Sequence, residues 1–249
     1  MPDKPELKAA TQTPRRVLAI AAHPDDIEFG ASGSIARWVK EGAQVTYCIV
    51  TDGAAGSNTP DEDLKALVQT RQAEQCEAAE KVGVSDVIFL GYPDGALQPT
   101  IELRRDLTRV IRQIKPDRVI VQDPTTIFVE TDYINHPDHR AAGEAAIYAV
   151  FPSAETRPIF PELLAEGHEP HHVTELYLDM SLQPNTFVDI SDTLEQKVAA
   201  LLCHKSQVGE EAGKSVREWA GESGKQVGVT FAEHFRVMRF EKKDDNKEQ

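Results

Sequence analysis

The chain has 249 residues, 40% of them hydrophobic, so it is long enough to bury the core of one large α/β domain or two small ones. Its 41 acidic residues outnumber 27 basic ones, and the formal net charge is −14. A general nucleic-acid binder or a protein that adheres to an anionic membrane needs a basic surface, so this charge argues against both. We expect the excess acid to lie on a solvated surface.

The cysteines and the chain ends narrow the class of protein further. Cys48, Cys76 and Cys203 lie far apart without a CxxC pair, which favours a reducing compartment over a disulfide framework or thiolate zinc site. The sequence shows neither the apolar core of a signal peptide nor a run of the roughly 20 apolar residues that span a bilayer. We therefore expect a soluble, cytoplasmic protein whose single domain, 15–240, lies between a disordered segment, 1–14, and a charged, disordered tail, 241–249.

Short apolar runs alternate with helical patterns along the first half of the chain. The strands are expected at 16–22, 44–50, 86–90 and 117–122. The helices are expected at 34–42, 61–82 and 101–114. Strands separated by helices pair in parallel, so the pattern predicts an α/β fold: a Rossmann-like, doubly wound, mostly parallel sheet with helices on both faces.

The second half of the chain is less regular. Helices are expected at 136–151 and 191–205. Further strands are expected at 173–180, 186–190 and 234–240. A Pro-rich loop follows the first of these helices, but no clear linker divides the chain, which favours one domain.

One histidine and three acidic residues follow the first predicted strand, in "AIAAHPDDIEFG" (19–30). Ligands of a doubly wound sheet bind beyond the carboxyl ends of its strands, which is where this turn is expected. His23 and Asp26 are three residues apart and can face one point in a helix-like turn, while Asp25 points elsewhere. An imidazole and a carboxylate that converge in this way are suitable ligands for a divalent metal.

A second cluster of similar design, "NHPDHR" (135–140), lies beyond the fourth predicted strand at the same edge of the sheet. His136 and His139 are again three residues apart, and Pro137 suits a first helical position. A single histidine after a strand is more often a core or capping residue than a ligand. A catalytic zinc usually takes three protein ligands and one water, so the two motifs together predict a His, Asp, His metal site.

The quoted motifs, together with "HPDHRAAG", "FLGYPDG" and "HKSQ", resemble the LmbE-like or PIG-L family of zinc-dependent N-deacetylases over about 15–240. The resemblance implies a Rossmann-like fold with His23, Asp26 and His139 as the ligands of Zn²⁺, another divalent metal such as Fe²⁺ being the alternative. Homo-oligomers are common in such families, although nothing in the sequence locates an interface.

The same resemblance implies the roles of three further residues. Asp25 would be the general base, His136 would face the substrate carbonyl, and Asp138 would hold and tune His136. The activity implied is hydrolysis of an acetyl group from an amide nitrogen of a small polar substrate, with N-acetylglucosamine conjugates as the leading class.

Three alternatives to this function stay open at the level of the sequence. The first is an amidase of a thiol or amino-sugar conjugate with the same metal chemistry. The second is a non-catalytic metal-binding protein, against which Asp25 and His136 argue because neither is needed merely to hold zinc. The third is a nucleotide-dependent Rossmann enzyme, against which "TDGAAGS" (51–57) argues because it lacks the GxGxxG spacing and a Walker lysine.

Two charged residues are candidates for substrate binding. Arg71 falls on the inward stripe of the helix over 61–82, either in a structural ion pair with Glu74 or reaching the substrate pocket as the family resemblance implies. Asp94 follows the third predicted strand, and it either caps the turn before Gly95 or, as the resemblance implies, accepts a bond from a sugar hydroxyl.

Several other polar residues have less specific interpretations. Some relatives carry an oxyanion-assisting tyrosine two residues before His136; here Ile134 has that position and Tyr133 is beside it, so either Tyr133 substitutes or the assistance is missing. His204 ends a predicted helix and would complement its dipole, a packing or substrate-edge role being the alternative. A third cluster is expected to be a surface loop with incidental metal affinity: His168, His171 and His172.

Overall fold

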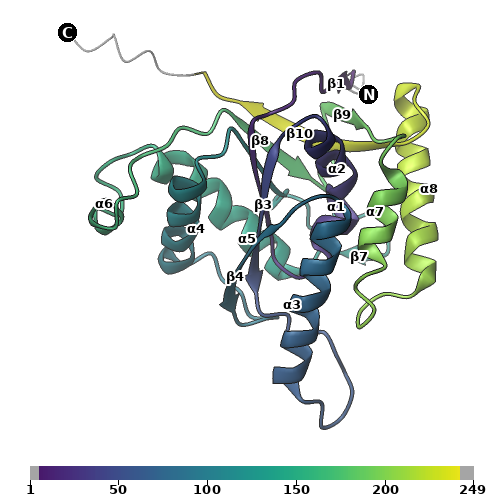
Figure 1. The fold of residues 1–249 in the computed structure, drawn as a ribbon, viewed down its shortest axis with the longest axis horizontal. Helices are drawn as coiled ribbons and strands as arrows, with labels where there is room; N and C mark the ends of the chain where they lie inside the picture. Colours follow the sequence, from purple (N-terminus) through teal and green to yellow (C-terminus); the bar gives the residue numbers. More distant parts are fainter. Residues whose placement is uncertain (1–5, 242–249) are drawn as a thin grey trace.

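The computed structural model describes residues 6–241, and its centre is an eight-stranded sheet in the order β1-β9-β10-β8-β5-β2-β3-β4 (Figure 1). Its strands are β1 (Lys8–Ala9), β2 (Arg16–Ala21), β3 (Gln44–Thr51), β4 (Asp86–Tyr92), β5 (Arg118–Gln122), β8 (Glu175–Asp179), β9 (Thr186–Asp189) and β10 (Ala232–Arg239). Strand β10 is antiparallel to both neighbours, whereas the other pairs in the sheet are parallel. The predicted fold class, a mostly parallel Rossmann-like sheet, is confirmed.

Helices cover both faces of this sheet (Figure 1). One face carries α2 (Ser32–Lys40), α3 (Leu64–Lys81), α7 (Leu194–Leu201) and α8 (Glu210–Val227). The other carries α4 (Ile101–Ile114), α5 (Pro137–Tyr148) and the π-helical segment η1 (Ala149–Ala154). The remaining helices, α1 (Asp26–Gly30) and α6 (Glu162–Ala165), are short.

The side chains of β2 alternate between two hydrophobic cores because successive residues of a strand point to opposite faces. Val17 and Ala19 belong to the core that includes Trp38 of α2, while Leu18 and Ile20 belong to the core beneath α4 and α5. Both faces are therefore buried, which explains why this strand is a continuous apolar run.

The order of the strands creates a crevice between β2 and β5. From β2 the chain proceeds outward to β3 and β4, and β5 then pairs with the opposite side of β2. Connections diverge at such a switch point, which leaves a binding crevice beyond the carboxyl ends of the two strands. His23 follows β2, and His136 follows β5 after a small hairpin of β6 (Phe128–Val129) and β7 (Tyr133–Ile134), so the topology places both histidine motifs at this crevice.

Some elements differ from those predicted. Strand β1 lies within the segment 1–14 that was predicted to be disordered, because backbone hydrogen bonds of Lys8 and Ala10 join it to β9. Helix α8 was not predicted, and the helix predicted over 136–151 ends as α5 at Tyr148 and continues as η1. The rest of the predicted terminal segments, 1–5 and 242–249, lies outside the described residues.

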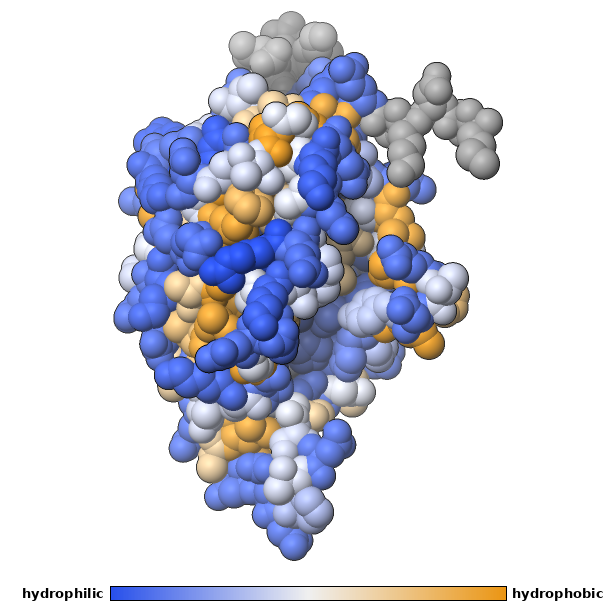
Figure 2. Space-filling view, turned by 90° about the vertical axis from the view of Figure 1, so that its right-hand side faces the viewer, coloured by the Kyte–Doolittle hydropathy of each residue, from blue (hydrophilic) through white to orange (hydrophobic). Residues whose placement is uncertain are grey.

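The face of the molecule on the side of α7 and α8 is mainly hydrophilic, with small, separate hydrophobic areas (Figure 2). This agrees with the acidic composition of the chain. Across residues 6–241, the structure contains no helix with the length and apolar character needed to cross a membrane.

Candidate metal and active site

Asp26 joins the two histidine motifs. As the first residue of α1, it accepts a hydrogen bond from the backbone N–H of His23 at Oδ2 (2.8 Å), and the same oxygen lies 3.4 Å from His23 Nδ1. Its other oxygen, Oδ1, lies 3.0 Å from Nε2 of His139. All three residues are at most 9% exposed. The structure thus brings the three predicted metal ligands together from distant parts of the chain.

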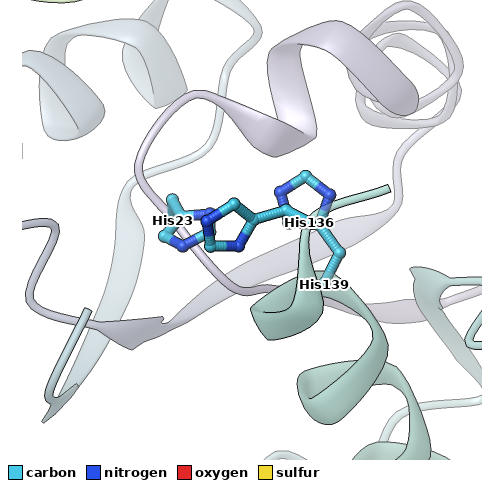
Figure 3. A group of neighbouring side chains, drawn as sticks. All are labelled: His23, His136 and His139. Atoms are coloured by element: carbon cyan, nitrogen blue, oxygen red, sulfur yellow. The ribbon is translucent and has the colours of Figure 1, made fainter. Parts of the chain in front are cut away.

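Helix α5 begins at the site and carries the second motif. His136 is its N-cap, and its ring Nδ1 accepts a hydrogen bond from the backbone N–H of Asp138 (3.2 Å). His139 Nδ1 lies 2.9 Å from Asn135 Oδ1, which orients the ring so that Nε2 faces Asp26 Oδ1 at 3.0 Å. The ring centroids of His136 and His139 are 4.7 and 5.1 Å from that of His23 (Figure 3).

The side chains of this site fit a divalent cation. Ring nitrogens of His23, His136 and His139 lie within 4.8 Å of one another, and so do ligand atoms of His23, Asp94 and Asp138. Imidazole nitrogens combined with carboxylate oxygens are the donor set that zinc and similar metals take. His23 Nε2 is buried and makes no well-formed hydrogen bond to any described residue, although Asp94 Oδ1 lies 3.0 Å away.

Opposite charges in close contact shift the titration of the predicted ligands. Burial opposes protonation of His23, but its contacts with Asp26 and Asp94 outweigh burial and raise the pKa of His23 to about 10. Burial would likewise raise the pKa of Asp26, but His139 and His23 hold it far below its usual range. Asp26 therefore stays an anion, and a metal ion at His23 would replace a tightly held proton.

Asp25 lies beside these ligands in an unusual backbone conformation. Its φ of 104° is in the left-handed region, which is uncommon for a residue other than glycine. Burial, followed by the charge of Asp26, raises the pKa of Asp25 to about 7, while the nearby charge of Arg71 acts in the opposite direction. Arg71 Nη2 lies 3.5 Å from Asp25 Oδ2. A carboxylate in this setting can accept a proton near neutral pH.

Arg71 reaches the site, and the other of its two possible roles, an ion pair with Glu74, is not formed. Arg71 is 4% exposed, and its guanidinium donates to the carbonyl oxygens of Gly53 (2.8 Å) and Pro24 (2.9 Å). It also lies 3.7 Å from Asp94 Oδ2. Glu74, three residues further along α3, instead accepts bonds from the backbone N–H and the hydroxyl of Ser206.

Asp94 faces the ring of His23 in addition to holding a loop. Its Oδ1 lies 3.0 Å from His23 Nε2, and its Oδ2 accepts a hydrogen bond from the backbone N–H of Ala55 (2.9 Å). Burial would raise the pKa of Asp94, but the contact with His23, the hydrogen bond from Ala55 and the charges of His23 and Arg71 lower it. The carboxylate is therefore ionised, and its partners are protein groups of the site.

The carboxylate of Asp138 has partners other than the predicted one. Its oxygens accept hydrogen bonds from the backbone N–H groups of Gly95 (2.7 Å) and Leu97 (3.1 Å), and Oδ2 lies 3.4 Å from His23 Nε2. Only the backbone N–H of Asp138 bonds to the His136 ring. The side chain thus fixes the loop after β4 against α5, because its position in the first turn of α5 directs it at that loop.

His136 and Tyr133 are the candidate groups that would face a substrate. Burial, followed by the charges of His23 and His139, lowers the pKa of His136, so the ring is neutral. Since Nδ1 accepts a backbone hydrogen bond, the proton is on Nε2 and that atom is a donor. Burial and the charge of Asp26 raise the pKa of Tyr133, whereas Ile134, at the position expected for a tyrosine, is 70% exposed.

Sequence reasoning missed a buried polar layer behind Asp25. His204 was expected to complement a helix dipole, with a packing or substrate-edge role as the alternative; it is fully buried and its Nε2 lies 3.1 Å from Glu28 Oε2. Gln75 is also fully buried and donates to both carboxylate oxygens of Glu28 at 3.2 Å. Gln75, Glu28 and His204 lie far apart in the sequence, so no local pattern could have shown that they contact one another.

The third histidine cluster does not converge on one point. His168 approaches Glu166, His171 Nε2 lies 2.7 Å from the carbonyl oxygen of Pro116, and His172 Nδ1 lies 2.7 Å from Glu155 Oε2. The three rings contact different parts of the molecule, and the described residues place no common metal donor set there.

A doubly wound α/β sheet with a His/Asp donor cluster at its switch point defines the class of a metal-dependent α/β hydrolase. Residues 18–150 match the family model PIG-L, described as GlcNAc-PI de-N-acetylase. The chain is 35% identical over 230 residues to the diacetylchitobiose deacetylase of Thermococcus kodakarensis, covering 90% of this chain and 83% of the relative. The chain belongs to the PIG-L (LmbE-like) family of N-deacetylases.

Two further comparisons extend the match over nearly the whole chain. The structure of N,N′-diacetylchitobiose deacetylase from Pyrococcus horikoshii, solved with an inhibitor, matches with a TM-score of 0.83 at 32% identity, covering 91% of this chain and 84% of that one. A probable N-acetyl-α-D-glucosaminyl L-malate deacetylase of Bacillus anthracis is 28% identical over 94% of this chain and 98% of its own length. The similarity therefore includes the second half of the chain, beyond the residues of the family model.

Proposed function

We propose that this protein is a zinc-dependent N-deacetylase that hydrolyses the acetamide group of a small N-acetylglucosamine conjugate to acetate and a free amine. The observation that carries the proposal is the convergence of His23, Asp26 and His139 beside Asp25, whose carboxylate is poised to take a proton. The names of the relatives from Thermococcus and Bacillus both describe deacetylation of N-acetylated glucosamine units, which supports the substrate class.

His23, Asp26 and His139 would hold the metal ion, with zinc favoured by their nitrogen and oxygen donors and Fe²⁺ as the alternative. When bound, a divalent ion acts as a Lewis acid that lowers the pKa of water to about 7 and polarises the amide carbonyl. A residue behind the predicted ligands supports this assignment: Asn135 contacts Nδ1 of His139 and so fixes the ring with Nε2 toward the site.

Asp25 would act as general base and then as general acid. The water oxygen attacks the carbonyl carbon while Asp25 takes one of its protons; the C–N bond then breaks and the amine nitrogen receives that proton. A pKa raised to about 7 suits both transfers, because the carboxylate is then basic enough to take the proton from water and acidic enough to give it to the amine. Acetate and the amine are the products, and no further reactant is needed.

His136 would stabilise the negative charge that develops on the carbonyl oxygen. Its Nε2–H is a donor, and its lowered pKa keeps the ring neutral, so it acts by hydrogen bonding. The raised pKa of Tyr133 keeps its hydroxyl protonated and supports it as a second donor from the β6–β7 hairpin. We assign Asp94 to orienting His23, since its carboxylate oxygens already face His23 and Ala55.

The experiment pairs zinc content with acetate release from N,N′-diacetylchitobiose for the wild type and the isosteric variant Asp25→Asn. We expect about one zinc per chain in both proteins and a loss of kcat of about 10²–10⁴-fold in the variant, because only the proton acceptor is removed. Asp192→Asn, at an exposed position, is the matched control and should retain full activity. Equal turnover by Asp25→Asn would overturn the assignment of the base.

Cytoplasmic location and homo-oligomerisation remain predictions from the sequence and the family. A sugar conjugate of low molecular weight is the partner that the site and the relatives support.

A further inference from the structure

We propose that Gln75 is a positioning residue that, together with Arg71, clamps the peptide group between Pro24 and Asp25 and so aims the Asp25 carboxylate. The inference rests on the proposed role of Asp25 as general base. Both residues belong to α3, a helix that supplies none of the predicted metal ligands.

The peptide group before Asp25 needs an external constraint. The left-handed φ of 104° at a residue other than glycine costs on the order of 1–3 kcal/mol and persists only when surrounding groups enforce it. The carbonyl of Asp25 accepts the first bonds of α1, from the N–H groups of Glu28 (3.0 Å) and Phe29 (3.1 Å). A turn bond from the Asp26 N–H to the His23 carbonyl oxygen (3.4 Å) spans the preceding peptide, but the C=O of Pro24 and the N–H of Asp25 take no part in any of these bonds.

Helix α3 holds both polar groups of that preceding peptide. Arg71 Nη2 donates to the carbonyl oxygen of Pro24 (2.9 Å), and the N–H of Asp25 donates to Gln75 Oε1 (3.0 Å). Positions 71 and 75 are one helical turn apart, so their side chains leave the same face of α3 and reach the opposite ends of one peptide plane. Rotation of that plane would break both hydrogen bonds together.

The orientation of the Gln75 amide is itself determined. Its nitrogen donates to both carboxylate oxygens of Glu28 at 3.2 Å, and His204 Nε2 lies 3.1 Å from the same carboxylate. A flipped amide would place a donor against the Asp25 N–H and an acceptor against the Glu28 carboxylate, so neither contact would survive. Gln75, Glu28 and His204 are all fully buried, so these bonds are shielded from bulk solvent.

The arrangement explains why a glutamine is suited to this position. An apolar residue of similar size would leave the Asp25 N–H without a partner in the protein interior, and the Glu28 carboxylate with the His204 contact but no amide donor. A side chain with only donors could bond to Glu28 but not to the Asp25 N–H. The position requires one acceptor and one donor at the end of a chain of this length.

The test is a double-mutant cycle of Gln75→Met and Asp25→Asn, measured with N,N′-diacetylchitobiose. Because the base would be displaced, Gln75→Met should lower kcat by about 10–100-fold. KM and zinc per chain should not change. In the Asp25→Asn background, Gln75→Met should have less than about a threefold effect, because its action passes through Asp25.

Thr108→Val provides the matched control for loss of a buried hydrogen bond, since Thr108 of α4 is fully buried and its hydroxyl donates to the carbonyl oxygen of Arg104 (2.7 Å). It should lower stability and leave kcat unchanged. If Gln75→Met does not fold, Gln75→Asn takes its place, because the shorter amide draws back from Asp25 while staying polar beside Glu28.

Two results separate failure of this inference from failure of the proposed function. Full activity in Asp25→Asn would contradict the role of Asp25 itself. Loss of activity in Asp25→Asn combined with wild-type kcat in Gln75→Met, or equal losses from Gln75→Met in both backgrounds, would overturn the clamp alone.

Discussion

Carboxylates outnumber permanent cations at the crevice between β2 and β5. Asp25, Asp26, Asp94 and Asp138 all approach it, and Arg71 is the guanidinium among them. Grouped carboxylates repel one another in a medium of low dielectric constant, and a divalent ion would compensate that repulsion directly. The charge distribution therefore supports metal binding independently of the geometry of the ligands.

Asp179, at the end of β8, is affected by these charges, and its titration should make the stability of the fold depend on pH. The residue is 5% exposed; burial, followed by the charge of Asp26, raises the pKa of Asp179 to about 7. A carboxyl group whose pKa is raised in the folded state favours folding in its protonated form. Its contribution is fully present below the unfolded pKa of about 3.9 and is lost as the pH rises through about 7.

We predict that Asp179→Asn makes the free energy of unfolding less dependent on pH. Relative to the wild type, the metal-free variant should gain on the order of 1–2 kcal/mol between pH 5.5 and pH 8, because an amide has no proton to lose. Urea denaturation in the presence of a chelator at the two pH values measures this difference. An identical stability difference between the proteins at both pH values would show that Asp179 does not titrate in this range.

At the scale of elements, the packing of α5 on β5 sets the position of the second histidine motif. A Cβ atom at Gly143 would lie 2.5 Å from the carbonyl oxygen of Gln122, the last residue of β5. Glycine at this position lets the helix approach the strand end closely. His136 and His139 lie at the start of the same helix, so this approach determines their distance from His23.

We predict that Gly143→Ala displaces α5, lowers stability by about 1–3 kcal/mol through overpacking and weakens zinc binding. Gly221→Ala in α8 is the matched control, because its Cβ would have ordinary contacts of 3.6 and 3.8 Å with Phe231. That variant should be unchanged or stabilised by up to about 1 kcal/mol, since alanine favours a helix over glycine. Thermal unfolding and zinc titration measure both effects; unchanged zinc affinity in Gly143→Ala would contradict the proposed link.

The elements that the sequence predicted well have strong local patterns. The helix over 101–114 agrees with α4, where Thr100 caps the N-terminus and Lys115 ends the helix in the left-handed region. Helix α8 was missed because its buried face consists largely of small residues, among them Gly213, Ala220 and Gly224, which do not form an apolar stripe in the sequence. Strand β1 is only two exposed residues long, and its pairing depends on β9 far along the chain.

At the scale of the whole molecule, the parallel sheet made the approximate location of the site predictable. Once strands β2 and β5 were expected to be parallel, the motifs that follow them had to meet at one edge. The partners within the site were less predictable. Arg71 bonds to Pro24 and Gly53 instead of Glu74, because tertiary contacts decide among several carbonyl and carboxylate groups within its reach.

The site offers three candidate donor sets for the metal. The set implied by the family is His23, Asp26 and His139; a second has His136 in place of Asp26, and a third combines His23 with Asp94 and Asp138. The roles differ as well: His136 can act on the substrate only if it does not hold the metal. The central claim of the proposed function is therefore the identity of the third ligand.

An anomalous difference map at the zinc edge, from crystals of the zinc-loaded protein, tests that claim most directly. We predict one strong peak within about 2.0–2.2 Å of His23, Asp26 and His139, with His136 outside bonding distance. A peak bonded to His136 in place of Asp26, or one located away from the crevice between β2 and β5, would contradict the account.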